Sequence, residues 1–168
     1  VNHVLGLEVV LPDGEIVWAY CRGIVVRDAS DEPSFIVTHF VDFTARKLAE
    51  SREQQADLRF EREFADAPNG IALVDLDGAF IKVNRSLREI MGYTEQELLA
   101  LTLPAITHPE DLDADREQVE ALLDGQTDRY VVEQVYFAAR GRLIWTKVAR
   151  SLVRDSDGRP VHFIVHVE

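Results

Sequence analysis

The chain has 168 residues, of which 46% are hydrophobic and 29% charged, the balance of a soluble globular protein with room for one domain and part of another. Its net charge of −12 argues against direct binding to nucleic acid or to an anionic membrane surface. Its single cysteine excludes an internal disulfide, and no apolar run approaches the ~20 residues of a membrane span. We therefore expect a cytoplasmic protein without direct membrane contact.

Three strands are predicted in the first 43 residues. Residues 5–11, 15–27 and 34–43 are rich in β-branched and aliphatic side chains, and polar turn sequences separate them. Consecutive strands with short connections predict an antiparallel meander. A sheet this small is marginal unless another layer covers its apolar face. We expect that face to be buried against a second chain or against the helix that follows.

A long helix is predicted over residues 45–66, which contain no glycine or proline and are dense in good helix formers. Thr44 is a suitable residue to cap it. An imperfect stripe of possible buried positions consists of Leu48, Gln55, Leu58 and Phe64. The helix is either a coiled-coil linker or a single amphipathic helix. At ~30 Å in length it would transmit rotation or register between flanking domains, which a flexible linker would not.

The remaining residues, 68–168, alternate between strand and helix signals. Two short strands come first, then helices with capping signals at Asn84 and Thr94. Pro104 and Pro109 are expected to bracket a turn before a longer helix over 110–124. Three strands close the chain, at 129–138, 143–155 and 161–167. This order predicts an α+β domain, with one five-stranded antiparallel sheet and its helices packed on one face.

An internal repeat links the two parts of the chain. Residues 14–41 align without a gap with residues 141–168, and seven of the aligned pairs are identical. Those pairs are Gly14/Gly141, Trp18/Trp145, Val26/Val153, Arg27/Arg154, Asp28/Asp155, Pro33/Pro160 and His39/His166. The matches fall at expected turn and strand positions, as a repeated structural unit requires. Nothing before the first copy resembles residues 69–125, and the second copy stops at Glu168, where the first continues with residues 42–44. We therefore expect the sequence to be a piece of a longer protein, cut at both ends.

Several motifs carry a family resemblance. Residues 64–71 read FADAPNGI, 75–78 read DLDG, 91–98 read MGYTEQEL and 108–111 read HPED. Residues 42–44 read DFT, similar to the Asp-x-Thr that ends one such domain and begins the helix after it. Together these motifs resemble the PAS family over nearly the whole chain. The resemblance implies a PAS-like sheet with helices on one face.

The resemblance also implies an organisation and a role. Residues 1–44 would be the closing three strands of a truncated first PAS domain, 45–67 a helical signalling linker, and 68–168 a second, essentially complete PAS domain. PAS domains are sensory modules of bacterial signalling proteins, usually dimeric, placed upstream of an output domain. That output is often a histidine kinase, a diguanylate cyclase or phosphodiesterase, or a phosphatase. The homodimer and the parent chain's output domain are therefore the expected partners.

A ligand pocket would lie between the inner face of the sheet and the helices. Strand alternation and similarity to cofactor-binding PAS domains place these residues around it: Met91, Leu103, Ile106, Gln134, Tyr136, Thr146, Val148, Phe163 and Val165, with Leu87, Ile90, Val119 and Val167 beside them. The polar members could orient a small ligand among apolar neighbours. The alternative is a filled core in which these polar side chains satisfy one another.

No cofactor is predicted. A flavin-binding PAS domain needs a cysteine near the place of Leu103 and amides near the places of Tyr136, Thr146 and Val167, and none of these four residues is a cysteine or an amide. A haem-binding one needs a histidine inside the long helix, whereas His108 precedes it. His162 and His166 would stand ~13 Å apart on an extended strand, too far to share one metal ion. A small-molecule ligand of another kind stays possible.

Catalytic residues are not expected either. The carboxylates of the long helix are expected to spread around a solvated face, without a partner base or nucleophile. They are Glu110, Asp111, Asp113, Asp115 and Glu117. Three functional hypotheses remain open: a dimeric non-catalytic relay, a small-molecule receptor and a protein-interaction scaffold.

The two tryptophans are candidate interface residues. Trp18 and Trp145 occupy equivalent positions in the repeat, and Trp145 points outward if Thr146 points inward. An outward tryptophan on a sheet packs either against a second subunit or against the chain's own linker helix. The predicted interface residues are Trp18, Trp145, Leu48 and Leu58.

Overall fold

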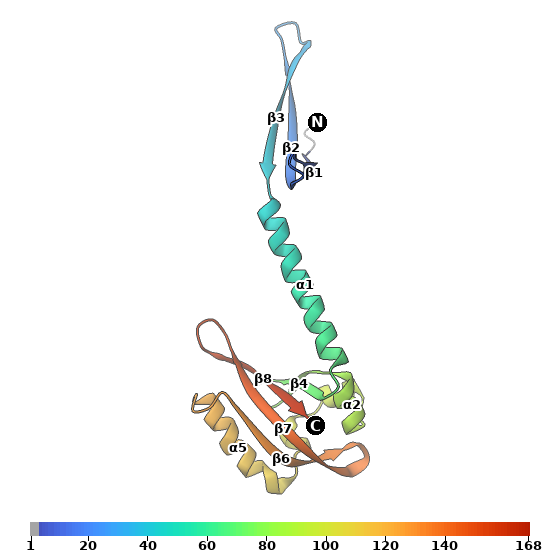
Figure 1. Cartoon of the computed structure of the whole chain (residues 1–168), viewed down its shortest axis with the longest axis vertical. Helices are drawn as coiled ribbons and strands as arrows, with labels where there is room; N and C mark the ends of the chain where they lie inside the picture. Colours follow the sequence, from blue (N-terminus) through green and yellow to red (C-terminus); the bar gives the residue numbers. More distant parts are fainter. Residues whose placement is uncertain (1–3) are drawn as a thin grey trace. The chain divides into compact units, whose positions relative to one another are not determined.

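A computed structural model describes residues 4–168, which fall into two compact units that divide after Arg59 (Figure 1). One unit holds a three-stranded antiparallel sheet, and the other holds a five-stranded antiparallel sheet with helices. The predicted fold class is therefore confirmed. Residues 1–3 of the predicted first domain lie outside the described part of the chain.

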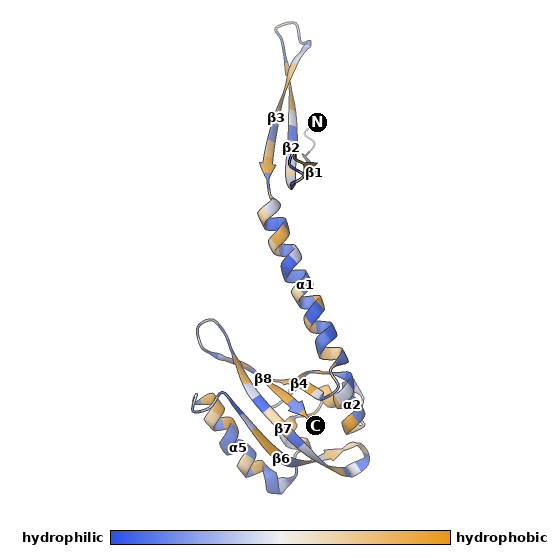
Figure 2. Ribbon diagram, in the orientation of Figure 1, coloured by the Kyte–Doolittle hydropathy of each residue, from blue (hydrophilic) through white to orange (hydrophobic). Residues whose placement is uncertain are grey.

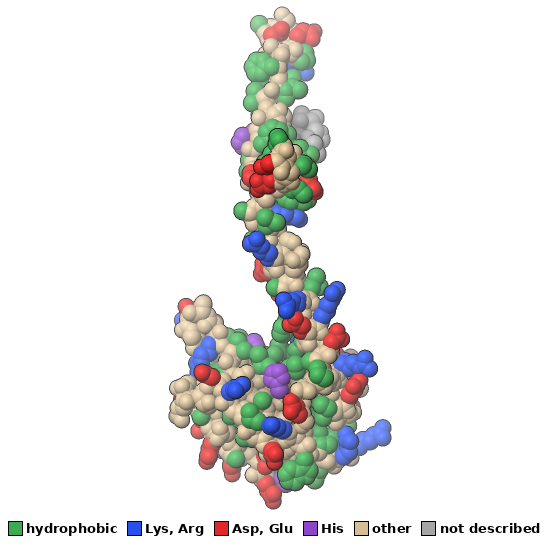
Figure 3. All heavy atoms as spheres, viewed as in Figure 1, with side chains coloured by type: hydrophobic (Ala, Val, Ile, Leu, Met, Phe, Trp, Pro, Cys, Tyr) green, Lys and Arg blue, Asp and Glu red, His purple; other side chains and the backbone are tan. Residues whose placement is uncertain are grey.

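The first sheet consists of β1 (Val4–Val10), β2 (Ile16–Arg27) and β3 (Pro33–Asp42), in the order β1-β2-β3. Its strands match the predicted meander to within one or two residues at each end. Most of its large apolar side chains are exposed, as the hydrophobic surface of this sheet in Figure 3 illustrates. Helix α1 leaves most of these side chains uncovered, and burial of this face against a second chain stays a prediction.

The long helix α1 spans Thr44–Asp66 without a break, as its composition predicts. Its surface is mostly hydrophilic (Figure 2), and Phe64 is its one buried residue. Phe64 packs within the second unit, where the Lys82 ammonium lies 5.1 Å from the centre of its ring. Lys82 also forms an ion pair with Glu61, which fixes the last turns of α1 against β5.

The second sheet has the strand order β5-β4-β8-β7-β6, and all its neighbours are antiparallel. Its strands are β4 (Gly70–Val74), β5 (Phe80–Val83), β6 (Arg129–Ala138), β7 (Arg142–Arg154) and β8 (Pro160–Val167). Apolar residues dominate β4, β6 and β8 (Figure 2). Alternate residues of β8 are buried, which gives the sheet one inner face.

Four helices connect β5 to β6: α2 (Arg85–Met91), α3 (Glu95–Leu99), α4 (Leu103–Ile106) and α5 (Pro109–Leu123). Sequence reasoning expected only a turn where α4 forms. Thr102 caps α4 by accepting from the Ala105 N–H, and Pro104 is tolerated because the first turn needs no amide donor there. The predicted turn is therefore replaced by a short helix.

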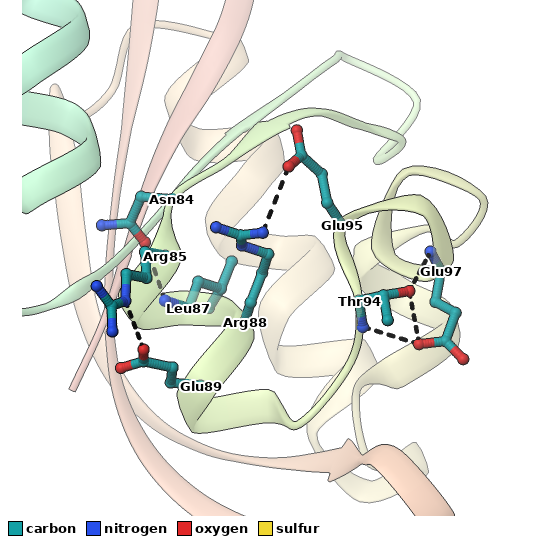
Figure 4. A network of polar contacts seen from close by, with 8 residues as sticks. All are labelled: Asn84, Arg85, Leu87, Arg88, Glu89, Thr94, Glu95 and Glu97. Carbon is teal, nitrogen blue, oxygen red and sulfur yellow. Dashed lines mark hydrogen bonds and ion pairs between the residues drawn. The ribbon is translucent and has the colours of Figure 1, made fainter.

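The caps of α2 and α3 follow the sequence signals (Figure 4). The Asn84 side chain accepts from the Leu87 N–H at 2.9 Å, and Gly92 ends α2 with a φ of 75°. Thr94 and Glu97 form the predicted capping box at α3. These caps fix the two short helices over the inner face of the sheet, where Leu87, Met91 and Leu98 join the core.

The two sheets contain the same three-stranded structure. Every residue pair between β1 and β2 has its counterpart 127 positions later between β6 and β7, from Val4↔Arg22 with Val131↔Ala149 to Val10↔Ile16 with Phe137↔Leu143. The next hairpins also agree, including a register shift before Arg27 and before Arg154. The repeat seen in the sequence is therefore a repeat of backbone register and turn geometry.

Matching side-chain contacts stabilise the two turns. The Arg27 guanidinium donates to the Asp31 carbonyl, and Arg154 donates to the Gly158 carbonyl. Asp28 and Asp155 each accept two backbone N–H groups of their own turn. These contacts explain why Arg-Asp is identical in both copies.

Candidate functional site

The residues predicted to line a pocket lie in the core of the second unit. The inner face of the sheet buries seven of them: Gln134, Tyr136, Thr146, Val148, Phe163, Val165 and Val167. The helices opposite bury Leu87, Met91, Leu103 and Ile106, and Ile90 and Val119 are partly buried beside these. The cavity left between Met91, Tyr136 and Val165 measures about 10 Å³. Such a volume is about that of one water-sized probe. A larger ligand at that place needs side chains to move.

The polar members of this set are hydrogen-bonded to one another. The Tyr136 hydroxyl donates to Gln134 Oε1 at 3.0 Å, and the Thr146 hydroxyl donates to the Gln134 carbonyl at 3.0 Å. Gln134 Nε2 in turn donates to Asp115 Oδ1 at 2.8 Å. A ligand that engaged Gln134 would have to replace one of these bonds. Their role in ligand binding stays a prediction.

Asp115 does not lie on a solvated face, so the expectation for this carboxylate was wrong. It is 7% exposed and accepts from Gln134, from the Tyr130 hydroxyl at 2.8 Å and from Arg150 Nη1 at 3.2 Å. The other four carboxylates of that group are at least partly exposed. One turn of α5 thus carries Asp115 inward, where three donors from the sheet compensate the loss of its hydration.

Arg150 was not singled out by sequence reasoning, although it is 4% exposed at the centre of β7. Its guanidinium carbon lies 5.5 Å from the centre of the Tyr130 ring and 5.9 Å from that of Phe163, within the range of cation–π attraction. Strand alternation could have found it, because Arg150 shares its face of β7 with Thr146 and Val148, both of which are predicted to point inward. Asp115 and Arg150 thus form a buried ion pair between helix and sheet.

Burial raises the pKa of both tyrosine hydroxyls in this network, Tyr130 and Tyr136, above the ordinary value for tyrosine. The Arg150 charge opposes the shift in each case but is the smaller effect. Both hydroxyls therefore stay protonated at neutral pH and act as donors. This protonation state fits the hydrogen bonds that they make to Asp115 and Gln134.

A larger cavity of about 270 Å³ opens beside this network. Its wall is formed by α5, the end of β4 and the turn after it, α4, β7 and β8. Asp115 and Arg150 line it, together with Leu103 and Phe163 from the predicted pocket. The volume lies just below the ~300–1,000 Å³ typical of drug-sized ligand sites. The cavity is thus offset from the predicted centre toward the turn at Asp77.

Three histidines lie in the second unit, and His108 is the one with a capping and packing role. His108 is the N-cap of α5, and its ring stacks on Phe137 at 5.7 Å between centres. His162 is half-buried and His166 exposed on the outer sheet face. Among residues 4–168, no group of three histidine, cysteine or acidic side chains is placed to hold a metal ion.

The predicted interface residues differ in exposure. Trp145 is 81% exposed on the outer face of the second sheet, as the strand alternation predicts. Trp18 is half-buried, and the Lys47 ammonium from α1 lies 5.8 Å from the centre of its ring. Leu48 and Leu58 are exposed on α1. In this chain Trp18 therefore meets its own helix, whereas Trp145 is uncovered.

The Asp-Phe-Thr sequence joins the first sheet to the start of α1. The Trp18 N–H donates to the Thr44 hydroxyl oxygen, and the Thr44 N–H donates to Asp42 Oδ1, both at 2.8 Å. Hydrogen bonding from the Thr44 side chain, and then from its backbone N–H, lowers the pKa of the Asp42 carboxyl. Tyr20 also stacks on Phe43 at 4.2 Å between ring centres. The first turn of α1 is thus bonded directly to the central strand β2.

The fold and the sequence together define a sensory class of domain. The sequence model of the family described as the PAS fold matches residues 80–167, and the chain belongs to this family. The PAS domain of an HTR-like protein from Haloarcula marismortui has a similar fold, with a TM-score of 0.59 at 23% identity over 73% of this chain and 98% of that one. The resemblance inferred from the motifs is therefore confirmed.

Two signalling proteins are similar in sequence. The probable diguanylate cyclase DgcE of Escherichia coli K12 is 36% identical over 114 residues, which are 68% of this chain and 10% of that protein. The sensor histidine kinase TmoS of Ectopseudomonas mendocina is 25% identical over 138 residues, 80% of this chain and 14% of that protein. The chain is thus similar to sensory parts of bacterial signal-transduction proteins and spans a small share of their length.

Proposed function

We propose that the chain is a sensory relay module of a larger signal-transduction protein. In this proposal residues 1–44 belong to a first PAS domain, 45–67 form a signalling linker, and 68–168 are a second PAS domain. The module dimerises and passes conformational change along α1 to an output domain of the histidine kinase or diguanylate cyclase/phosphodiesterase type. It performs no catalysis itself and acts in the cytoplasm. Within residues 4–168 no helix is long and apolar enough to cross a membrane.

The observation that carries the proposal is the repeated register of the two sheets, followed in the first copy by α1. Phe163 and Val167 are 3% and 2% exposed beneath the helices of the second unit, whereas their counterparts Ile36 and Phe40 are 66% and 58% exposed. In this proposal the exposed Ile36 and Phe40 mark the face that a helical layer would cover in a complete first domain. The hydrogen bond from the Trp18 N–H of β2 to the Thr44 hydroxyl oxygen connects that sheet directly to the first residue of α1.

Dimerisation is supported by apolar side chains that the single chain leaves exposed. Leu48, Leu58 and Phe60 are 47%, 60% and 47% exposed on α1. A free helix would gain little stability from such residues, whereas a paired helix would bury them. The uncovered Trp145 supplies a further apolar contact of the kind enriched in interfaces.

Sedimentation equilibrium of the whole chain tests this proposal. We expect a concentration-dependent dimer, and we expect the double substitution Leu48→Ser with Leu58→Ser to weaken it. A matched control replaces the exposed Glu53 on the same helix by Ser and should leave the dimer intact. A wild-type chain that stays monomeric at high concentration would remove the basis of the relay proposal.

A second candidate function is a small-molecule receptor, and the 270 Å³ cavity beside Asp115 and Arg150 favours it. Native mass spectrometry of freshly purified protein separates this function from a pure relay or from a pure protein-interaction scaffold. A co-purified small molecule supports the receptor, whereas a bare mass favours a relay or scaffold.

A further inference from the structure

The first copy of the repeat shows what covers a tryptophan at this position of the sheet. Trp18 of β2 bonds through both of its backbone groups to the segment that begins α1. Its N–H donates to the Thr44 hydroxyl oxygen, and its carbonyl accepts from the Phe43 N–H, each at 2.8 Å. The Lys47 ammonium of the first helical turn lies 5.8 Å from the centre of the Trp18 ring. The helix that follows the sheet therefore half-buries this tryptophan.

A second aromatic residue of β2 extends the contact. Tyr20 lies on the same face of the strand as Trp18, because side chains two residues apart point the same way. The Tyr20 ring stacks on Phe43 at 4.2 Å between ring centres, and its hydroxyl accepts from Arg46 Nη2 at 3.4 Å. The docking surface for the first turn of α1 thus consists of two outward residues of β2 and the backbone of one of them.

The second copy contains the same strand arrangement around Trp145. The pairing of β7 with β8 ends at Lys147 and Glu168, which exchange two backbone hydrogen bonds as the counterparts of Tyr20 and Val41. Backbone groups two residues apart on a strand point to the same side, so the N–H and carbonyl of Trp145 point past the end of β8. Within the described strand β8 no residue lies opposite them, and the Trp145 side chain is 81% exposed.

We propose that β7 at Trp145 docks the first turn of a helix that follows Glu168 in the longer protein, begins after an Asp-aromatic-Thr sequence as α1 does, and covers Trp145 as α1 covers Trp18. The inference rests on the proposed function, in which the chain continues to an output domain. The Trp145 N–H donates to the threonine hydroxyl of that segment, and the Trp145 carbonyl accepts from the N–H of its aromatic residue. Strand β7 then carries the outgoing helix on one face and the buried pair of Asp115 and Arg150 on the other.

One difference between the copies sets the chemistry of the docked turn. Lys147 is exposed at the place that Tyr20 has in the first copy. Its ammonium attracts the face of an aromatic ring at the place of Phe43, but it repels an arginine at the place of Arg46. An acidic residue at that place would pair with Lys147 instead. The turn that fits Trp145 best therefore differs from that of α1 in the charge at this one position.

The test attaches a second copy of residues 42–59 after Glu168 of the whole chain. Labelling with 5-fluorotryptophan gives two fluorine resonances, which Trp145→Phe assigns. We expect the extension to shift the Trp145 resonance and to slow exchange of the Trp145 backbone N–H at least about tenfold, because a hydrogen bond must open before the amide exchanges. In the attached copy, Arg46→Glu should strengthen both effects. Thr44→Val in that copy removes the acceptor and should abolish the slowing.

Trp18 is the internal control, because α1 already occupies its site and its resonance should not move. If neither the original extension nor the Arg46→Glu version changes Trp145, the proposal is wrong. An equal effect of the Thr44→Val version would also overturn it. So would a Trp145 resonance that moves only with protein concentration, which would assign this face to a second copy. Dimerisation through Leu48 and Leu58 is measured on the chain without the extension, so the relay proposal is tested separately.

Discussion

Asp115 and Arg150 are 35 residues apart in the chain, yet Arg150 Nη1 lies 3.2 Å from Asp115 Oδ2 and both side chains are almost fully buried. The pair joins the middle of α5 to the central part of β7. Tyr130 and Gln134 of β6 complete the bonding of the carboxylate. Asp115 of α5 is thus bonded to both β6 and β7. A displacement of α5 would therefore alter the hydrogen bonds of these two strands.

Replacing Asp115 by Ala should destabilise the second unit by about 3–5 kcal/mol, because Arg150 would be left buried without a counter-ion. Urea unfolding followed by circular dichroism measures this loss. The double substitution Asp115→Leu with Arg150→Met removes both charges and should recover much of it. Asp113→Ala is the matched control, since Asp113 is exposed on the same helix. Equal losses for Asp113→Ala and Asp115→Ala would contradict the assignment.

The extents of the strands, the caps and the repeat are local or periodic features, so the sequence predicts them well. The capping bonds of Asn84 and Thr94 and the bonds of the Arg-Asp turns join residues no more than four apart, and strand alternation places Trp145 outward. Pro104 was misjudged because a proline is equally compatible with a turn and with the first turn of a helix. Asp115 was misjudged because its burial depends on donors from β6 and β7. Only the tertiary fold brings those donors together.

Asn84→Ala should cost about 2 kcal/mol, since it removes a cap and leaves buried backbone groups unpaired. Asn84 Oδ1 accepts from the N–H groups of Leu87 and Ile71, and its Nδ2 donates to the Asn69 carbonyl. The substitution therefore loosens α2 and β4 together. Thermal and urea unfolding measure the loss. Asn69→Ala, which removes only an exposed bond to Glu168, should cost far less.

The α3 capping box predicts an acid-sensitive contribution to stability. The Thr94 backbone and side-chain hydrogen bonds lower the pKa of the Glu97 carboxyl in the folded state. A folded pKa below the unfolded one gives stability that is present above the unfolded pKa and is lost as the pH falls through the folded pKa. Glu97→Gln should therefore flatten the acid side of the stability profile. Melting temperatures from pH 3 to 7, roughly the range over which carboxyl groups titrate, measure this.

In that series Glu95→Gln serves as the control, because Glu95 contacts the Arg88 side chain at 3.5 Å and lies outside the capping box. Its acid profile should follow that of the unsubstituted chain. If Glu97→Gln leaves the stability profile at low pH unchanged, the hydrogen bonds from Thr94 do not lower the pKa of the Glu97 carboxyl in solution.

Removing residues 1–43 should change the oligomeric state of the chain. The deleted sheet exposes Ile36 and Phe40 on the face whose counterparts, Phe163 and Val167, are buried in the second unit. Water-exposed apolar surface of this kind favours association, because burying it releases about 25 cal/mol per Å². Light scattering coupled to size-exclusion chromatography, over a range of concentrations, compares the full and the shortened chain.

The whole chain also allows a finer version of this experiment. Ile36→Lys with Phe40→Lys places charges on the face proposed to be covered, and it should weaken association as the deletion does. His39→Lys places a charge on the opposite face of the same strand, because side chains alternate along β3. It should leave association unchanged. If the full chain, the deletion variant and the double lysine variant have the same oligomeric state, this sheet does not form the interface between copies. The remaining candidates for that interface would then be α1 and the face that carries Trp145.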